Sequence, residues 1–146
     1  MRTDGQWIKD EAGRTLLLRG VNLSGSAKVP QTPLGASHLR SSHLTPELAS
    51  FVGRPLPLAE ADEHFARLRA FGHFFVRLVV TWEAIEHAGP GQYDLAYLDY
   101  LRALIEKAAR YELKIFVDPH QDVWSRFTGG DGAPAWTLDV VGMKRE

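Results

Sequence analysis

The chain has 146 residues, of which 45% are hydrophobic and 24% charged, and this composition excludes general disorder because it supplies ample apolar surface for a core. Its 17 basic and 18 acidic residues give a formal net charge of −1, so no overall positive charge favours nucleic acid or an anionic membrane. The absence of cysteine excludes disulfides, thiolate metal sites and cysteine nucleophiles.

The apolar segments are too short or too interrupted to predict a membrane span. The longest of them, residues 70–82, contains His73 and Arg77, and residues 1–6 lack the apolar region of a signal peptide. We therefore expect a cytoplasmic protein without a transmembrane segment. No partner protein is predicted.

The first elements are predicted to be a short β-hairpin and a strand. Residues 6–9 have an extended pattern, residues 10–13 form a turn that ends in glycine, and residues 15–23 form the strand. Its apolar run is typical of a strand that is buried on both faces of a parallel sheet. The proline-rich segment 24–57 then predicts a long loop, with a helical turn beginning at Thr45.

Two helices and two strands follow. A helix over residues 58–71 is predicted to end at Gly72, and a strand over residues 74–80 comes next. The apolar face of this helix consists of Leu58, Ala61, Phe65, Leu68 and Phe71. Asp94 is predicted to cap a second helix that runs to Tyr111. Its apolar stripe consists of Leu98, Leu101, Leu104, Ile105 and Ala108.

The remaining elements are a third strand and a short helix. Residues 114–118 predict another buried strand, and residues 136–141 predict the helix. Strands that alternate with helices indicate an α/β fold with a mostly parallel sheet. A doubly wound sheet and part of a (β/α)₈ barrel both fit this order. The barrel is favoured because long polar segments follow the strands at the end where barrels carry their active sites, and because no GxGxxG motif follows the first strand.

Polar residues within or directly after the predicted strands are the candidates for a functional site. Arg77 interrupts an apolar strand, so we expect it to be paired, either in a structural salt bridge or beside a carboxylate or ligand oxygen of the site. His120 and Asp122 follow the third strand and could contact sugar hydroxyls or a similar polar ligand. Loop stabilisation is the alternative. A metal site at these two residues is a further alternative, and it is weakly supported because two ligands do not make a site.

Three tryptophans lie in or beside the loops that follow strands. Trp124 is the better candidate for stacking on a ligand, whereas Trp82 follows a strand directly and is expected in the core. Glu83 is expected to cap or bridge loop structure. The glycine-rich segment 128–132 lacks the GK[ST] ending of a phosphate-binding loop.

Four blocks of the sequence resemble glycoside hydrolase family 5, the cellulase family. They are residues 18–23, 76–78, 80–86 and 117–126, in the order and at the spacing of the first three barrel strands. The nearest branch is the endoglycoceramidase-related enzymes, which include fungal β-glucosidases that act on glucosylceramide and steryl glucosides. The segment 28–30 also fits that branch, and the resemblance extends from Gly5 to about Gly142.

This resemblance implies that residues 1–146 form a hairpin and the N-terminal three βα units of a (β/α)₈ TIM barrel, and that the rest of the barrel is absent. It implies a retaining glycosidase of glycolipid catabolism that needs no cofactor or metal. Arg77 would support the nucleophilic carboxylate, and His120 would line the subsite of the cleaved sugar. Lys28, Asp122 and Trp124 would be further sugar contacts.

The catalytic carboxyl groups are expected to lie outside this chain. Retaining glycosidases need two of them, and in this family the acid/base is the glutamate of an Asn-Glu pair after the fourth strand, while the nucleophile follows the seventh. The one asparagine here, Asn22, is followed by Leu23. We therefore expect the chain alone to be inactive, and to be aggregated or molten because three strands cannot close a barrel.

Three interpretations stay open at this point. The chain is the N-terminal part of a glycosidase, or a non-catalytic carbohydrate-binding or regulatory product, or a metal-dependent α/β hydrolase that uses His120 and Asp122.

Overall fold

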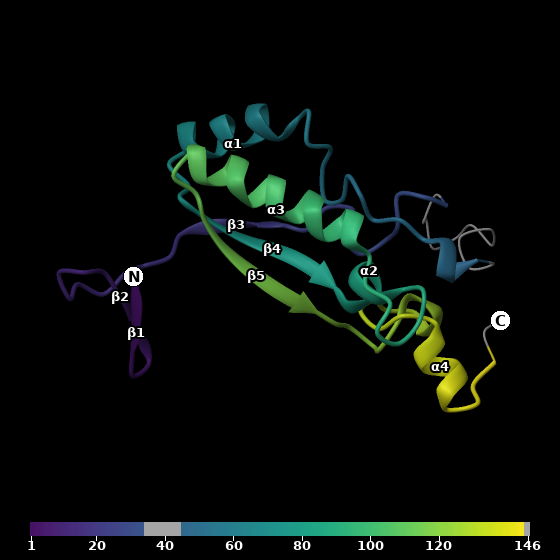
Figure 1. Cartoon of the computed structure of the whole chain (residues 1–146). Coiled ribbons are helices and arrows are strands. Elements are labelled where there is room, and N and C mark those ends of the chain that lie inside the picture. The colour runs from purple at the N-terminus through teal and green to yellow at the C-terminus, as the bar shows by residue number, and fades with distance from the viewer. Residues whose placement is uncertain (34–44, 145–146) are drawn as a thin grey trace.

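Three parallel strands form the centre of the molecule (Figure 1). The computed structural model describes residues 1–33 and 45–144. The strands are β3 (Gly20–Leu23), β4 (Phe75–Thr81) and β5 (Lys114–His120), and they lie side by side in this order. Each comes from a separate part of the chain, so the connections must cross over, as the alternation of strands and helices predicted.

Two helices occupy the crossovers and lie on the same side of the sheet (Figure 1). Helix α1 (Ala61–Ala70) precedes β4, and α3 (Leu95–Arg110) connects β4 to β5. Their buried side chains pack against alternate positions of β4, because successive strand residues point to opposite faces. The main core residues of these three elements are Ala61, Phe65, Val76, Leu78, Val80, Leu101, Leu104 and Ala108. The fold is therefore mixed α/β with a parallel sheet.

The two predicted helices are present, but their apolar faces differ in part from the prediction. Phe71 is 72% exposed, because α1 has already ended at Ala70, and Ile105 lies at the outer margin of the buried stripe of α3. Tyr97 and Tyr100 are buried on α3 instead. The Tyr100 hydroxyl donates to the carbonyl of Leu56 at 2.6 Å, and burial raises the pKa of Tyr100 to about 12.

The stop signal at Gly72 and the N-cap at Asp94 are confirmed, whereas the first helix begins at Ala61 and not at residue 58 as predicted. Gly72 has φ +80, in the left-handed region that favours glycine, and the following residue, His73, donates its amide to the carbonyl of Leu68 at 3.0 Å. At the start of α3, the Asp94 side chain accepts a hydrogen bond of 2.9 Å from the amide of Tyr97. Asp94 is therefore an N-cap that satisfies one of the free amides of the first turn.

We predict that Asp94→Ala lowers the helicity of a synthetic peptide spanning residues 92–112. Loss of an N-cap destabilises a helix by about 1 kcal/mol, which is large for an isolated helix of this length. The matched control is Asp99→Ala, within the same helix, where alanine has the higher helix propensity and is expected to raise the helicity. Circular dichroism measures both changes. Equal helicity in the two variants would contradict the capping role.

The N-terminal hairpin is present, but its ladder lies earlier in the chain than predicted. Strand β1 (Arg2–Asp4) pairs with β2 (Trp7–Lys9) around a turn at Gly5. After the predicted turn at residues 10–13, Thr15 makes only one bridge to Lys9. The next strand begins at Gly20, because the intervening residues span the distance between the hairpin and the sheet (Figure 1).

The predictions that β3 is buried on both faces and that β5 is a buried strand are wrong for these residues. Every position of β3 is exposed or half-buried, and on β5 Phe116 is 53% and Val117 46% exposed. The reason is their position, since β3 and β5 are the outer strands of the described sheet and each pairs with β4 alone. Only the central strand β4 has the buried pattern of a parallel sheet.

The segments that follow the strands contain short helices. The predicted turn after Thr45 is a 3₁₀ turn over Pro46–Leu48, and the last predicted helix is α4 (Trp136–Val140). Helix α2 (Trp82–Glu86), which the sequence did not predict, begins directly after β4. Residues 34–44 of the long loop lie outside the described part. Among the described residues, no helix has the length and apolarity needed to cross a membrane.

Candidate functional site

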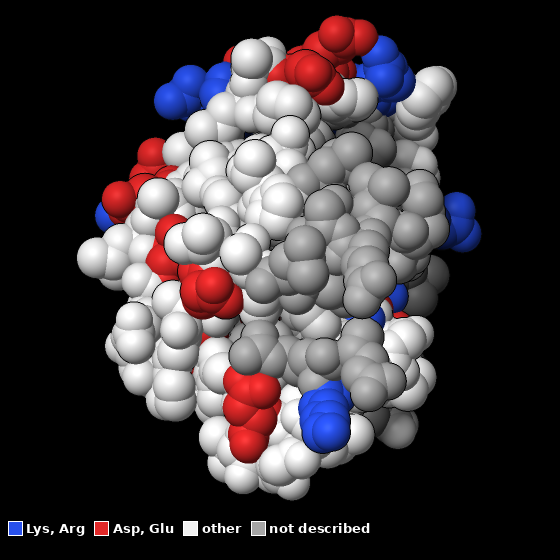
Figure 2. All heavy atoms as spheres, turned by 90° about the vertical axis from the view of Figure 1, so that its right-hand side faces the viewer, with Lys and Arg blue, Asp and Glu red and all other residues white. Residues whose placement is uncertain are grey.

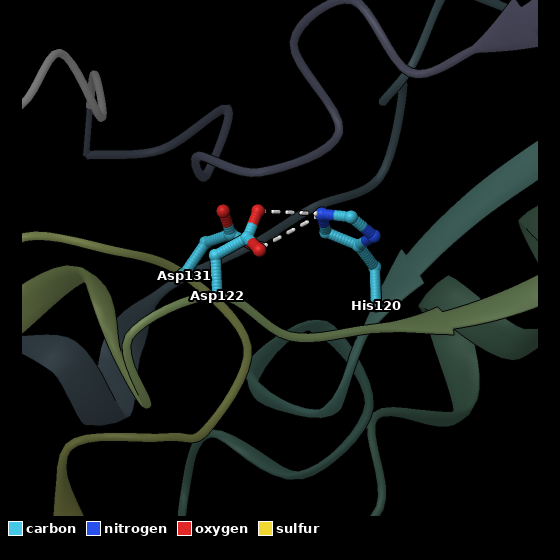
Figure 3. Close-up of side chains that lie close together, drawn as sticks. All are labelled: His120, Asp122 and Asp131. Carbon is cyan, nitrogen blue, oxygen red and sulfur yellow. Dashed lines mark hydrogen bonds and ion pairs between the residues drawn. The ribbon is translucent and has the colours of Figure 1, made fainter.

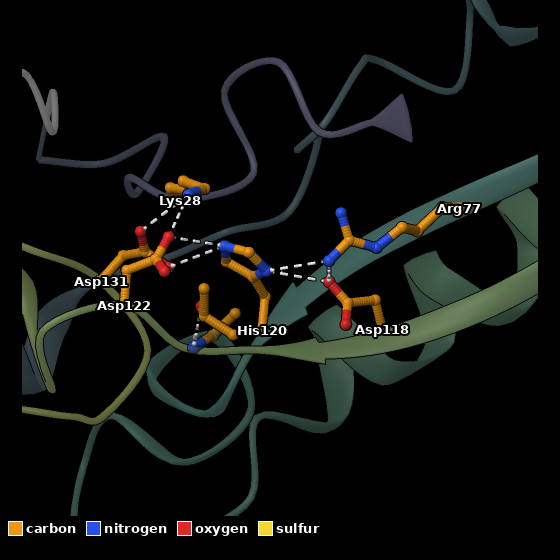
Figure 4. A network of polar contacts seen from close by, with 8 residues as sticks. Lys28, Arg77, Asp118, His120, Asp122 and Asp131 are labelled. Carbon is orange, nitrogen blue, oxygen red and sulfur yellow. Dashed lines mark hydrogen bonds and ion pairs between the residues drawn. The ribbon is translucent and has the colours of Figure 1, made fainter. Parts of the chain in front are cut away.

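Helices α2 and α4 lie at the carboxyl ends of β4 and β5 (Figure 1). Polar side chains form ion pairs at the same end of the sheet. Figure 2 views the molecule from this end: most visible described atoms belong to residues other than Lys, Arg, Asp and Glu, and the charged side chains form separate clusters. One set of ion pairs connects residues from the loop after β3, from strands β4 and β5, and from the loop after β5 (Figure 4). We call this set the strand-end network. It consists of Lys28, Arg77, Asp118, His120, Asp122 and Asp131.

The first half of the network lies on the sheet itself. The parallel register sets Val79 of β4 opposite Asp118 of β5, so that Arg77, Asp118 and His120 project from the same face. The Asp118 Oδ2 atom is 2.7 Å from an Arg77 guanidinium nitrogen and 2.9 Å from His120 Nδ1. Because an ionised carboxylate only accepts hydrogen bonds, Nδ1 is the donor to Asp118. Arg77 is therefore paired, as predicted, although 38% of its side chain is exposed.

The second half lies on the loop that follows β5. His120 Nε2 is 3.0 Å from Asp122 Oδ2 and 3.8 Å from Asp131 Oδ1 (Figure 3). The Lys28 ammonium group, from the first loop, lies 3.0 Å from a carboxylate oxygen of each aspartate. His120 thus connects the carboxylate on the strand to the two carboxylates on the loop. Lys28 connects the two loop carboxylates to the loop that follows β3.

The backbone of the loop brings Asp122 and Asp131 together. Each donates its amide to the carbonyl of the other, at 2.9 Å and 2.8 Å. A side chain at Gly130 would place its Cβ only 1.9 Å from the Asp122 carbonyl oxygen, so this close approach requires glycine. The glycine-rich segment therefore closes the loop on itself, which gives its glycines a role other than phosphate binding.

The charges of the network stabilise each other. Burial by itself lowers the pKa of Lys28, but the hydrogen bonds to Asp122 and Asp131 outweigh it and raise that pKa above its ordinary value. The hydrogen bond from Lys28, followed by the one from His120, lowers the pKa of Asp122. Lys28 and Asp122 are therefore both charged around neutral pH. Such a set of fixed donors and acceptors suits a ligand with several hydroxyl groups.

The structure adds a third candidate metal ligand, Asp131, to the two that the sequence offered. Ligand atoms of His120, Asp122 and Asp131 lie within 4.8 Å of one another. The Lys28 ammonium group already contacts both carboxylates, so a metal ion would have to displace it. The arrangement therefore favours an organic polar ligand over a cation.

Trp124 lies beside the network but takes part in a different contact. Its indole N–H donates to the Thr137 hydroxyl at 3.0 Å, and its ring lines a mainly apolar cavity of about 310 Å³ together with Leu138 and Val141. The ring is 45% exposed and accessible for stacking. Trp82 is not a core residue as predicted, because α2 begins there and the ring packs edge to face on Trp136 at the surface.

The sequence identified four of the six residues of the network. Asp118 and Asp131 were missed, although both carry weak signals. Asp118 is the one acidic residue in a strand that is otherwise apolar at its centre, and Asp131 stands between glycines in the segment 128–132. Only the register and the loop closure show that both point into the site (Figure 4).

No protein-family model matches the chain, but single proteins match it closely. Glucosylceramidase from Rhizopus delemar is 55% identical over 142 residues, which are 95% of this chain and 21% of that protein. The crystal structure of sterylglucosidase 1 from Cryptococcus neoformans superimposes with a TM-score of 0.88 at 50% identity, over 95% of this chain and 20% of the other. The chain is homologous to the endoglycoceramidase-related glycosidases of glycoside hydrolase family 5.

Endo-glycoceramidase II from Rhodococcus is a more distant member of this group. Its crystal structure superimposes with a TM-score of 0.60 at 31% identity, over 97% of this chain and 28% of that protein. These structural relatives are TIM barrels. The chain spans about a fifth of the length of the first curated glycosidases that it matches. The resemblance to family 5 that its sequence blocks indicated is thereby confirmed.

Proposed function

We propose that this chain forms the first three βα units of the (β/α)₈ barrel of a retaining β-glycosidase. We further propose that this enzyme hydrolyses the bond between glucose and the lipid in glucosylceramide or steryl glucosides. The observation that carries the proposal is the strand-end network. It lies at the carboxyl ends of parallel strands, where barrel enzymes bind substrate, in a chain homologous to glycolipid and steryl glucosidases.

The network supplies sugar contacts in this proposal. His120, Lys28 and Asp122 offer donors and acceptors to sugar hydroxyls, and Trp124 offers an apolar ring face. Arg77 and Asp118 fix the orientation of His120. In this proposal Arg77 would also support a nucleophilic carboxylate supplied by a later strand.

The two catalytic carboxyl groups come from outside these 146 residues in this proposal. A retaining mechanism needs two carboxyl groups about 5–5.5 Å apart on either side of the scissile bond. Asp118, Asp122 and Asp131 are instead engaged with Arg77, His120 and Lys28. The remaining four fifths of the relatives' length offers room for the missing pair.

A chimera tests the proposed function. In it, this chain replaces the matching segment of the Cryptococcus sterylglucosidase, with which it shares 50% identity. We expect the chimera to hydrolyse both a steryl glucoside and glucosylceramide in an assay of released glucose. The unmodified enzyme and the enzyme lacking the segment are the controls. A chimera that melts cooperatively but releases no glucose would contradict the proposal, and retained glucose binding would then favour a carbohydrate-binding module.

A further inference from the structure

A buried ion pair connects the start of α2 to the loop that carries half of the strand-end network. Arg126 Nε lies 2.8 Å and 2.9 Å from the two carboxylate oxygens of Glu83. The two side chains are 4% and 2% exposed, so neither charge is screened by water. Burial raises the pKa of Glu83, and Arg126 opposes this rise. The expected bridging role of Glu83 is thereby confirmed.

The backbone of Glu83 provides a second link to the same loop. Its amide donates to the carbonyl of Gly132 at 2.7 Å. The next residue toward the network is Asp131, whose backbone pairs with that of Asp122. Glu83 therefore holds the loop at two places, through Arg126 in its first half and through Gly132 at its end.

The loop needs this support because part of its backbone is strained. Val123 has φ +46 and Trp124 has φ +72, a region that bulky side chains rarely adopt. Both residues directly follow Asp122, so relaxation of their backbone would move that carboxylate. Strained backbone persists only where the surrounding structure over-determines it. The links from Glu83 meet this condition, together with Ser125, whose hydroxyl donates to the carbonyl of Ala133 at 2.7 Å.

We propose that Glu83 and Arg126 are positioning residues for sugar binding: their buried pair holds residues 121–132 in the strained conformation that sets Asp122 and Asp131 against Lys28 and His120. This inference rests on the proposed function and deepens it. The pair acts through the loop, and the residues it positions are those that meet the sugar.

The test compares three variants of the chimera. Glu83→Gln leaves the Arg126 charge buried without its partner and is expected to lower the melting temperature and raise KM. In the double variant Glu83→Leu with Arg126→Met, apolar side chains of similar volume are expected to restore the melting temperature. KM should nevertheless stay raised by about tenfold, with kcat changed less, because the loop geometry is not restored. Arg126→Lys keeps the charge, removes the guanidinium Nε that faces both carboxylate oxygens of Glu83, and should also raise KM.

The exposed pair Glu63 and Arg67 on α1 provides the control, since Glu63→Gln should change neither KM nor the melting temperature. Recovery of KM together with stability in the double variant would overturn the proposal, because the pair would then be merely structural. Failure of all three variants to fold would overturn it too. If the parent chimera folds but is inactive, the proposed function fails. The positioning role is then read from hydrogen exchange of residues 121–132, which should be faster in the double variant and unchanged if the role is absent.

Discussion

The 146-residue chain, produced on its own, is expected to show no cooperative thermal transition and to form aggregates instead of a monodisperse monomer. Strand β5 has one edge without a partner among the described residues, and exposed backbone groups on such an edge pair readily with other chains. Phe116 and Val117 of this strand are about half exposed. Val140, Val141 and Met143, at the end of the described chain, add further exposed apolar surface.

Calorimetry and light scattering measure this outcome, and an aryl β-glucoside assay on the same preparation should show no turnover. The chimera with the Cryptococcus sterylglucosidase is the matched control, because the rest of that enzyme covers the open edge in our proposal. A sharp transition from a monomeric sample would contradict the expectation about folding. Measurable turnover would contradict the location of the catalytic pair outside this chain.

His120→Ala in the chimera is expected to lower kcat/KM by roughly 10²-fold, because it releases the Asp118 and Asp122 carboxylates that His120 holds, and a misplacement of contact groups by about 1 Å can cost this much. The substitution also removes a proposed sugar contact. Steady-state kinetics on a steryl glucoside measure the change. The melting temperature, recorded in parallel, separates loss of binding from loss of the fold.

His64→Ala is the matched control for this prediction. His64 lies on the exposed side of α1, 3.7 Å from Glu60, and is remote in sequence from both strand ends. We expect its replacement to leave kcat/KM unchanged. If His120→Ala behaved like this control, His120 would not be part of the sugar subsite.

The helices and the central strand could be predicted because their signals are local. Asp94 and Gly72 mark helix ends through the hydrogen bonds and backbone angles of their own neighbourhoods, and β4 is apolar at almost every position. The burial of the outer strands could not be predicted in this way. An apolar run such as residues 114–118 predicts a strand. Whether that strand is buried depends on which other elements cover its faces.

The residues of the candidate site likewise fall into those that the sequence could predict and those that needed the structure. The types and positions of Arg77, His120 and Asp122 relative to the predicted strands were enough to select them, and the resemblance to family 5 added Lys28. Asp118 and Asp131 needed the structure, because a strand register and a loop closure bring residues together that are far apart in the sequence.

The sequence alone thus determined the α/β alternation, the helix signals at Gly72 and Asp94 and the chemical character of the strand ends, all of which follow from periodicity and local hydrogen bonding. The tertiary structure decided which side chains meet: Lys28 pairs with two aspartates of a distant loop, and Glu83 holds this loop through Arg126. Such contacts depend on distances between segments that no local pattern contains. They form only when the chain is packed and the buried charges must find partners.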